Sequence, residues 1–296
     1  HIKLWGDERD ILKEGKGFKA HLKNWLYQRE FLNSFKMSRK DMHLYIKKIN
    51  KFKPKIIESY IQSIYELAKF IKENNLKVHS PKGILTSAGN LYPDMQKIIE
   101  DTFKCKIYNR YGSREVGDMA CSCDKSNKLH LNIFSHYFEI LDKNLNPVNP
   151  GHIGNIYITT LNNYSMPLIR YKVGDLATSS KSIKCSCNRG LPLIEKVNGR
   201  EVNLFKTKTG ELIDGEYFTH MFYMKEWIKK FQVIQKNYDQ IEIKIVLNSQ
   251  PIEKDINEIK FGINKVMGKC NIKFKHCKNI PNLGNGKYLY TISKIK

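Results

Sequence analysis

The sequence predicts an α/β protein, with a mixed β-sheet in a large domain at residues 1–200 and a smaller α+β domain at residues 201–296. One observation is a strand, loop, helix and strand over residues 82–108, which is typical of a parallel β–α–β unit. A second is the alternation of apolar and polar residues over 129–161, which indicates antiparallel strands. Beyond Arg200 the order changes to two strands, a helix and a strand, and this change predicts the second domain.

Two helices are predicted ahead of the β–α–β unit. Ser38 and Asp41 have the spacing of a capping box and predict a helix that continues to about Asn50. Pro54 is typical of a helix start, and apolar residues then repeat at helical spacing. This stripe consists of Ile56, Ile57, Tyr60, Ile61, Ile64, Leu67, Ala68 and Ile71. We interpret it as a face that packs in the core.

The β–α–β unit places two polar loops at one edge of a sheet. Lys82–Thr86 is its first strand, Pro93 begins its helix, and its second strand ends at Tyr108. The loops that follow the strands are residues 87–89 and residues 109–112. Because ligands of open α/β sheets bind at the carboxyl ends of the strands, these two loops predict a pocket.

Polar groups continue beyond the second loop. Gly112 allows a ligand to approach the backbone, Ser113 offers a hydroxyl, and Glu115 is suited to hold a divalent cation near a phosphate. The alternative is a tight turn with Glu115 as a solvated charge. These residues alone do not decide between the two interpretations.

The second half of the large domain is predicted as antiparallel strands separated by turns. A further strand is expected over residues 167–171, and Val173–Asp175 is predicted as a turn that carries a carboxylate. In the smaller domain the predicted strands are residues 234–236, 241–247 and 272–276, with a helix at residues 252–267.

The composition limits the classes of function. The chain has 51 Lys and Arg against 29 Asp and Glu, a net charge of +22, which favours acidic partners or phosphorylated ligands. The lysines are spread along the chain without a basic block, so we interpret them as a solvated surface and expect no nucleic acid partner. No apolar run reaches membrane-spanning length. Seven cysteines and the lack of a secretory pattern predict a reducing, cytoplasmic location.

Four of the soft ligands in the sequence predict a structural zinc site. Cys123, His130, Cys185 and Cys187 supply the thiolates and imidazole that tetrahedral zinc prefers, and Cys121 is a spare ligand. Four protein ligands would close the coordination sphere, so the zinc would brace the fold and not catalyse. The competing interpretation is a set of free thiols in a reducing compartment.

The motifs, taken in order, resemble the adenylate-forming enzymes, in particular the phenylacetate–CoA ligase branch that includes CapK-type capsule-biosynthesis proteins. The resemblance covers the later part of the large domain and the whole C-terminal lid. The motifs that carry it are Ser87–Leu91, Asn109–Glu115, Tyr171–Asp175 with Gly199–Arg200, Cys185–Pro192 and Gly286–Lys287.

The resemblance implies an ATP-dependent ligase that forms an acyl adenylate from a carboxylic acid, with coenzyme A as a common acceptor of the acyl group. Ala88, Gly89 and Asn109 would shape the adenine pocket, Tyr111 would stack near the base, and Gly112 would let the nucleotide approach the backbone. Asp175 would bind the ribose hydroxyls and Arg200 the ribose or phosphate. Ser113 would contact the α-phosphate, Glu115 would orient Mg²⁺, and Lys287 would reach the reacting carboxylate from the mobile lid.

The sequence also departs from the family. It contains no Ser/Thr/Gly-rich phosphate loop ahead of Ser87, Gly89 stands where the branch often has Glu, and Asn203 falls near the family's hinge aspartate. We therefore expect either part of a longer protein or a truncated homologue. A non-catalytic nucleotide-binding protein is the first alternative to the ligase, and a basic, zinc-containing nucleic-acid-binding protein is the second.

Overall fold

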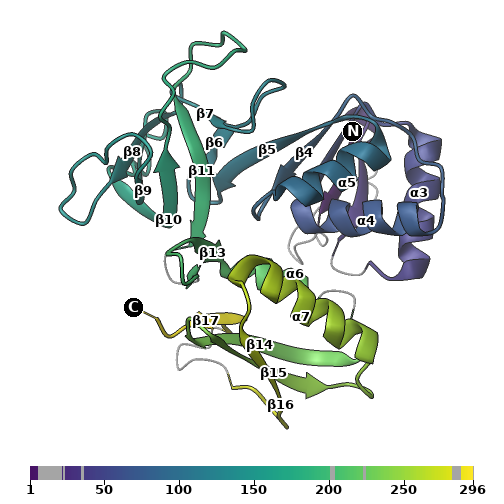
Figure 1. Ribbon diagram of the computed structural model, residues 1–296. Helices are drawn as coiled ribbons and strands as arrows, with labels where there is room; N and C mark the ends of the chain where they lie inside the picture. Colours follow the sequence, from purple (N-terminus) through teal and green to yellow (C-terminus); the bar gives the residue numbers. More distant parts are fainter. Residues whose placement is uncertain are drawn as a thin grey trace.

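The computed structural model describes residues 1–5, 22, 24–34, 37–200, 204–222, 225–281 and 288–295. In these residues eleven strands form one sheet in the order β2-β1-β3-β4-β5-β6-β7-β11-β10-β9-β8. A separate four-stranded sheet, β16-β15-β14-β17, lies in the C-terminal part (Figure 1). This arrangement confirms the predicted α/β fold with a mixed sheet and a smaller C-terminal α+β unit. The predicted boundary at Arg200 adjoins residues 201–203, which lie outside the described residues.

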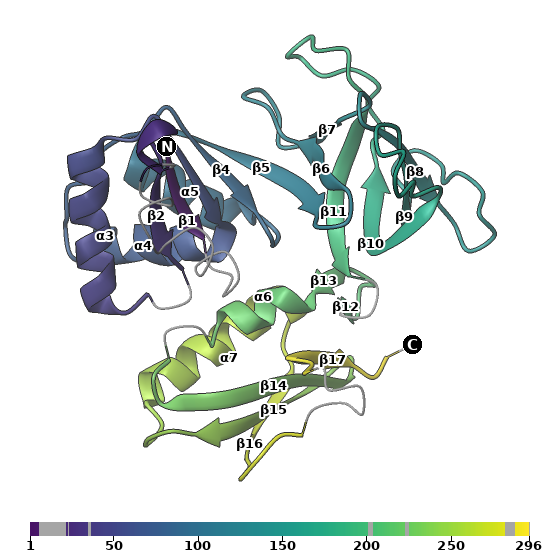
Figure 2. The ribbon, with the colours of Figure 1, turned by 180° about the vertical axis from the view of Figure 1, so that it is seen from behind.

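The first half of the large sheet is parallel. Its strands are β1 (Ile2–Trp5), β2 (Glu30–Asn33), β3 (Ile56–Tyr60), β4 (Gly83–Ser87) and β5 (Lys106–Ser113). Its helices are α3 (Arg39–Phe52), α4 (Ile61–Glu73) and α5 (Pro93–Phe103). The helices α4 and α5 cover one face of the strands, as the two opposite views show (Figures 1 and 2). The buried residues Ile2, Leu4, Ile57 and Ile84 point to this covered face and share one core with the helices.

The second half of the large sheet is antiparallel. Its strands are β6 (Gly117–Cys121), β7 (Leu129–Leu131), β8 (His136–Leu141), β9 (Ile153–Thr160), β10 (Tyr171–Ser179) and β11 (Leu193–Arg200). Strand β5 joins the two halves, because it pairs parallel with β4 and antiparallel with β6. A second core, which includes Met119, Ile156 and Ile158, fills this half.

The C-terminal part has its own core. Its elements are β12 (Leu204–Lys206), β13 (Leu212–Asp214), α6 (Gly215–His220), β14 (Ile228–Asn237), β15 (Gln240–Leu247), α7 (Glu253–Met267), β16 (Asn271–His276) and β17 (Thr291–Ser293). The buried side chains of Trp227, Ile243 and Ile263 join the sheet to α7. This confirms the predicted helix near residues 252–267 and the strands on either side of it.

The local start signals of two helices were predicted correctly. Ser38 and Asp41 form a capping box, with the Asp41 amide donating to Ser38 Oγ at 3.3 Å and the Ser38 amide donating to Asp41 Oδ2 at 3.0 Å. Pro93 occupies the first turn of α5, where its missing amide hydrogen costs nothing.

Four predicted element boundaries were wrong. The strand expected over residues 167–171 begins only at Tyr171, as β10. Ile56–Tyr60 is strand β3 and not the first turns of a helix, because it pairs on both sides with β1 and β4, and α4 begins only at Ile61. Residues 109–112 continue β5 instead of forming a loop. The predicted turn at Val173–Asp175 is a bulge inside β10, where Gly174 has a φ of +89° and the register with β9 shifts.

Candidate active site

A cavity of about 880 Å³ lies at the carboxyl ends of β1, β3, β4 and β5, where the C-terminal part faces the sheet. The predicted pocket loops both reach it. After β4 the backbone turns sharply, with φ values of +56° at Ala88 and +135° at Gly89. Ser87, Ala88 and Gly89 line one side of the cavity and Asn109 lines it nearby. The structure therefore brings these predicted site residues together.

Tyr111, Asp175 and Arg200 form a connected group in this cavity. The Tyr111 hydroxyl donates a hydrogen bond of 2.7 Å to Asp175 Oδ2. Arg200 Nε lies 3.5 Å from the other carboxylate oxygen of Asp175. Burial, together with the negative charge of Asp175 and this hydrogen bond, raises the pKa of Tyr111. Tyr111 therefore remains a neutral donor that holds the carboxylate in place.

Residues 112–115 form the next part of the cavity wall. A Cβ atom at Gly112 would approach the Gly117 carbonyl oxygen to 2.6 Å, so a larger residue does not fit without a shift. The Ser113 hydroxyl is buried and makes no hydrogen bond of normal geometry with the described residues. The Ser113 hydroxyl nevertheless interacts with the exposed Glu115 carboxyl, and this interaction is the main reason that the pKa of Glu115 is lowered. Glu115 is thus an ionised oxygen donor of the kind Mg²⁺ prefers.

The C-terminal part supplies the opposite wall of the cavity. Asp214, at the end of β13, is buried and accepts a hydrogen bond of 2.9 Å from Asn90 Nδ2. Gly199 has a φ of +106°, and a Cβ atom there would collide with the Asp214 carboxylate. Tyr288 and Tyr290 also line the cavity. Lys287 and Asn203, which were singled out in the sequence, lie outside the described residues.

Several lining residues escaped the sequence analysis. Trp5 and Tyr60 form a stacked pair in the cavity wall, Lys3 lies over the Trp5 ring, and Asp214 contacts Asn90. The Trp5–Tyr60 and Asn90–Asp214 contacts join residues far apart in the chain, and residues 1–36 show no clear period. The local signal is short, since Lys3 and Trp5 only alternate with the apolar residues Ile2 and Leu4.

The four predicted zinc ligands meet in space. The ligand atoms of Cys123, His130, Cys185 and Cys187 all lie within 4.8 Å of one another. The Sγ atoms of Cys123 and Cys185 are 3.7 Å apart, and Cys187 Sγ is 3.4 Å from His130 Nε2. A tetrahedral zinc with ordinary bond lengths needs edges of about 3.8 Å between two sulfurs and about 3.6 Å between sulfur and nitrogen. Cys121 is not in the group.

The surroundings of the four side chains also suit a metal. Burial, with a smaller contribution from the charge of Arg189, lowers the pKa of His130 and keeps its ring neutral, the form that binds metals. Cys123 follows β6, His130 lies in β7, and Cys185 and Cys187 lie between β10 and β11. An ion held there would tie two loops of the antiparallel half together.

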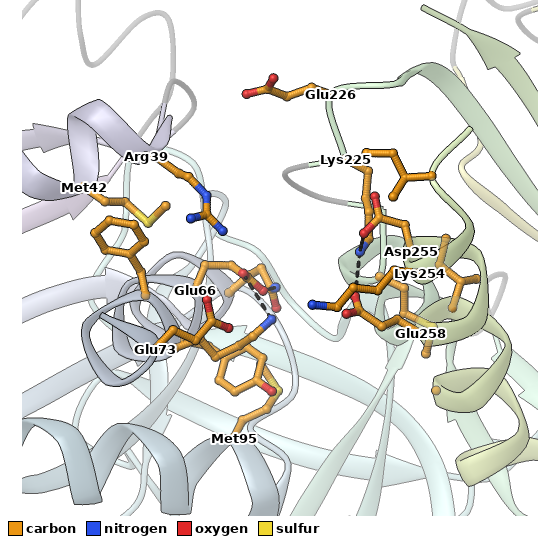
Figure 3. Close-up of a pocket in the computed structure, with 18 of the residues that line it drawn as sticks. Arg39, Met42, Glu66, Glu73, Met95, Lys225, Glu226, Lys254, Asp255 and Glu258 are labelled. Carbon is orange, nitrogen blue, oxygen red and sulfur yellow. Dashed lines mark hydrogen bonds and ion pairs between the residues drawn. The ribbon is translucent and has the colours of Figure 1, made fainter. Parts of the chain in front are cut away.

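A second cavity, of about 760 Å³, separates α3 and α4 from α7 (Figure 3). On one wall Lys225 binds Asp255 at 2.7 Å and Glu258 at 2.8 Å, and on the other Glu66 lies 3.5 Å from Lys69. Across the junction, Lys265 binds Asp94 at 2.7 Å. The charges of each wall are thus paired mainly within that wall. Interfaces of this polar kind allow domains to move relative to one another.

Comparison with known proteins identifies relatives of the sequence. Residues 205–294 match the CapK C-terminal domain family. Over 280 residues the chain is 24% identical to Protein CapK of Staphylococcus aureus. That match covers 92% of this chain and 61% of the relative, so the chain spans about three fifths of the length of the curated relative.

Solved structures share the fold at low sequence identity. One of them is a 2-hydroxyisobutyryl-CoA ligase in a postadenylation state with an acyl-AMP ligand. It superposes with a TM-score of 0.63 at 16% identity, and the match covers 99% of this chain and 65% of the ligase chain. McyG A-PCP with phenylalanyl-adenylate gives a TM-score of 0.63 at 15% identity, covering 97% of this chain and 50% of its own. Acetoacetyl-CoA synthetase from Streptomyces lividans gives a TM-score of 0.54 at 14% identity, and the match covers 84% of this chain and 42% of the synthetase. The chain therefore has the fold of the adenylate-forming ligases, and its C-terminal part matches the CapK C-terminal domain.

Proposed function

We propose that this chain binds ATP and activates a carboxylic acid as an acyl adenylate. The observation that carries the proposal is the Tyr111–Asp175–Arg200 group, which faces the Ala88–Gly89 turn across one cavity. The fold is that of ligases solved with acyl-AMP ligands. The resemblance to the CapK-type branch supports a place in surface-polysaccharide biosynthesis.

The nucleotide would lie with its adenine against the turn after β4 and beside Tyr111. Asp175 is already oriented by Tyr111, so its carboxylate can accept hydrogen bonds from both ribose hydroxyls without further reorganisation. A buried carboxylate of this kind discriminates against ligands that lack the hydroxyls. Arg200 would then move from Asp175 to the ribose or the α-phosphate.

In the reaction, a carboxylate oxygen of the acid attacks the α-phosphorus of ATP, and the bond to the β-phosphate breaks so that pyrophosphate leaves with the electron pair. Ser113 would donate a hydrogen bond to an oxygen of the α-phosphate, and Glu115 would hold Mg²⁺. When bound, Mg²⁺ offsets the charge that develops on the leaving group. We propose Lys287 as the cation that meets the reacting carboxylate, and a thiol such as coenzyme A as the acceptor.

Titration calorimetry with AMP and with ATP and Mg²⁺, followed by pyrophosphate exchange over a panel of carboxylic acids, tests the proposal. Binding with exchange supports the ligase. The Asp175→Ala variant should weaken AMP binding about tenfold or more, because it removes a hydrogen-bonding carboxylate. An unchanged affinity would remove Asp175 from the ribose site.

The second candidate is a nucleotide-binding protein without turnover. The Tyr111–Asp175–Arg200 group is compatible with it, because a ribose site binds a nucleotide whether or not an acid is activated. Tight nucleotide binding without exchange for any acid would select it. Binding of a nucleic acid that weakens steeply with salt, in the absence of nucleotide binding, would contradict both candidates.

A further inference from the structure

One end of the cavity is built from strands that lie beyond the nucleotide motifs. The parallel register places Leu4 beside Ser59, and therefore Trp5 beside Tyr60, while Tyr60 pairs with Ser87 of β4. In β1 and β3 the buried residues alternate with Lys3, Trp5 and Tyr60, so these three side chains share the sheet face opposite α4 and α5. All three line the cavity.

Trp5 and Tyr60 form a rigid apolar wall at this end. Their ring centroids lie 3.9 Å apart at an interplanar angle of 29°, which is a stacked arrangement. The ammonium of Lys3 lies 5.0 Å from the centroid of the Trp5 ring, within the range of a cation–π contact. The aromatic wall therefore also positions a positive charge.

Within the described part of the chain, no carboxylate neutralises the charge of Lys3. Its neighbour in the register is Glu58, but Glu58 binds Arg110 at 2.6 Å, and Arg110 also lies 3.3 Å from Asp118. Among the residues that the structure describes, Lys3 forms no ion pair. A lysine on an open surface would be solvated, whereas Lys3 is partly covered beside two aromatic rings, where an anion meets less competition from water.

We propose that Lys3, Trp5 and Tyr60 bind the far end of the carboxylic acid, and that they select an acid with an apolar or flat body and a second negatively charged group. The inference rests on the proposed function, since it assumes that the reacting carboxylate of the acid lies near Ser113. From β1 to β5 the sheet spans three strand spacings, about 14 Å, and Ser113 lies five positions beyond Tyr108, the residue of β5 in register with Lys3. A long, extended diacid lying obliquely across β3 and β4 would place one anion near Lys3 and the other near the nucleotide.

Titration calorimetry without nucleotide tests the proposal with two matched pairs of probes, octanoate against octanamide and benzoate against benzamide. Without nucleotide the one carboxylate of each acid can meet Lys3, so at least one acid should bind roughly tenfold to a hundredfold more tightly than its neutral amide, the range expected of one charge-assisted hydrogen bond. The Lys3→Met variant should bring the ratio close to one, and Lys3→Arg should retain most of the preference. Lys47→Met, which changes an exposed lysine of α3 outside the cavity, should leave the ratio unchanged.

Equal binding of acid and amide, a preference that persists in Lys3→Met, or no binding of any probe would overturn the proposal. The measurement does not need adenylation, so it separates this inference from the proposed function. If acids bind through Lys3 but pyrophosphate exchange is absent, the acid site stands and the ligase fails. If exchange occurs only with acids that bind without Lys3, the ligase stands and this site fails.

Discussion

Removal of the proposed zinc is expected to destabilise the antiparallel half of the large sheet. Two of the ligand–ligand distances, 3.7 Å and 3.4 Å, are close to tetrahedral edges and all lie within 4.8 Å, so metal binding requires only a small contraction. A metal that links Cys123 to Cys185 closes a loop across 62 positions in the sequence. The chain-entropy relation for a cross-link of that length gives about 4 kcal/mol of stabilisation. For a chain of this size, this corresponds to roughly 10 °C in the midpoint of thermal unfolding.

The assay is elemental analysis combined with thermal unfolding and hydrogen exchange. Protein produced with zinc should contain about one zinc per chain. Chelation or Cys123→Ser should lower the midpoint by roughly 10 °C. Exchange should accelerate at Leu129 and Ile194, which pair across β7 and β11 beside His130. Cys121→Ser is the matched control, because Cys121 is two residues from Cys123 but lies outside the cluster.

Metal-free protein whose unfolding midpoint does not change on chelation would refute this reasoning. The four side chains would then be ordinary thiols and a buried histidine. Equal destabilisation by Cys121→Ser and Cys123→Ser would also contradict a four-ligand site, since it would show that packing and not coordination is lost.

Three further predictions concern the candidate active site and the junction with the C-terminal part. Gly174→Ala should weaken AMP binding at least severalfold and cost about 1 kcal/mol of stability, because Gly174 at a φ of +89° forms the bulge next to Asp175. The control is Gly210→Ala, which has a φ of +83° and open space around it. This variant should lose a similar amount of stability but keep the AMP affinity measured by calorimetry. Lys287→Ala should abolish pyrophosphate exchange and preserve most of the nucleotide affinity; an equal loss of binding would contradict its role as the reacting cation. Asp94→Asn should cost up to about 1 kcal/mol, because its partner Lys265 is half exposed. Partial burial acts to raise the pKa of Asp94, but the hydrogen bond and charge of Lys265 outweigh it and lower the pKa, while Asp94 raises that of Lys265. The contribution of the pair should therefore be present at neutral pH, disappear as pH falls below about 4, and decline as pH rises above about 10.5. Denaturant titrations of both proteins across this range check it, and a difference that does not shrink as pH falls below about 4 would show that the ion pair is not its source.

Local signals in the sequence predicted the parts of the fold that depend on neighbours in the chain. The capping box at Ser38 and the proline at the start of α5 need only residues a few positions away. Ile56–Tyr60 was misassigned because its apolar residues fit a helical period, and only pairing with β1 and β4 makes it a strand. Strand pairing between distant segments overrides the local pattern, and the sequence does not record it directly.

The candidate site divides in the same way. Its motif residues lie on short stretches of chain, and their chemical types indicated a role before their positions were known. Residue type likewise selected the four metal ligands, although Cys123 and Cys185 are far apart in the sequence. Trp5, Tyr60 and Asp214 carry no such signal, since each acquires its place from a contact with a different strand or domain.

The residues proposed to bind the nucleotide and those proposed to select the acid lie on different strands. The residues proposed to hold the nucleotide are positioned by β4, β5 and the bulge in β10, and short motifs suffice to specify them. The residues proposed to contact the far end of the acid come from β1 and β3, whose sequences carry no motif and are constrained mainly by burial of the opposite face. The outward positions of those two strands can therefore change without disturbing the core at Ile2, Leu4 and Ile57. Substitutions at Lys3, Trp5 and Tyr60 should accordingly alter which acid binds more than they alter stability, and comparing acid affinity with the unfolding midpoint for each variant separates the two effects.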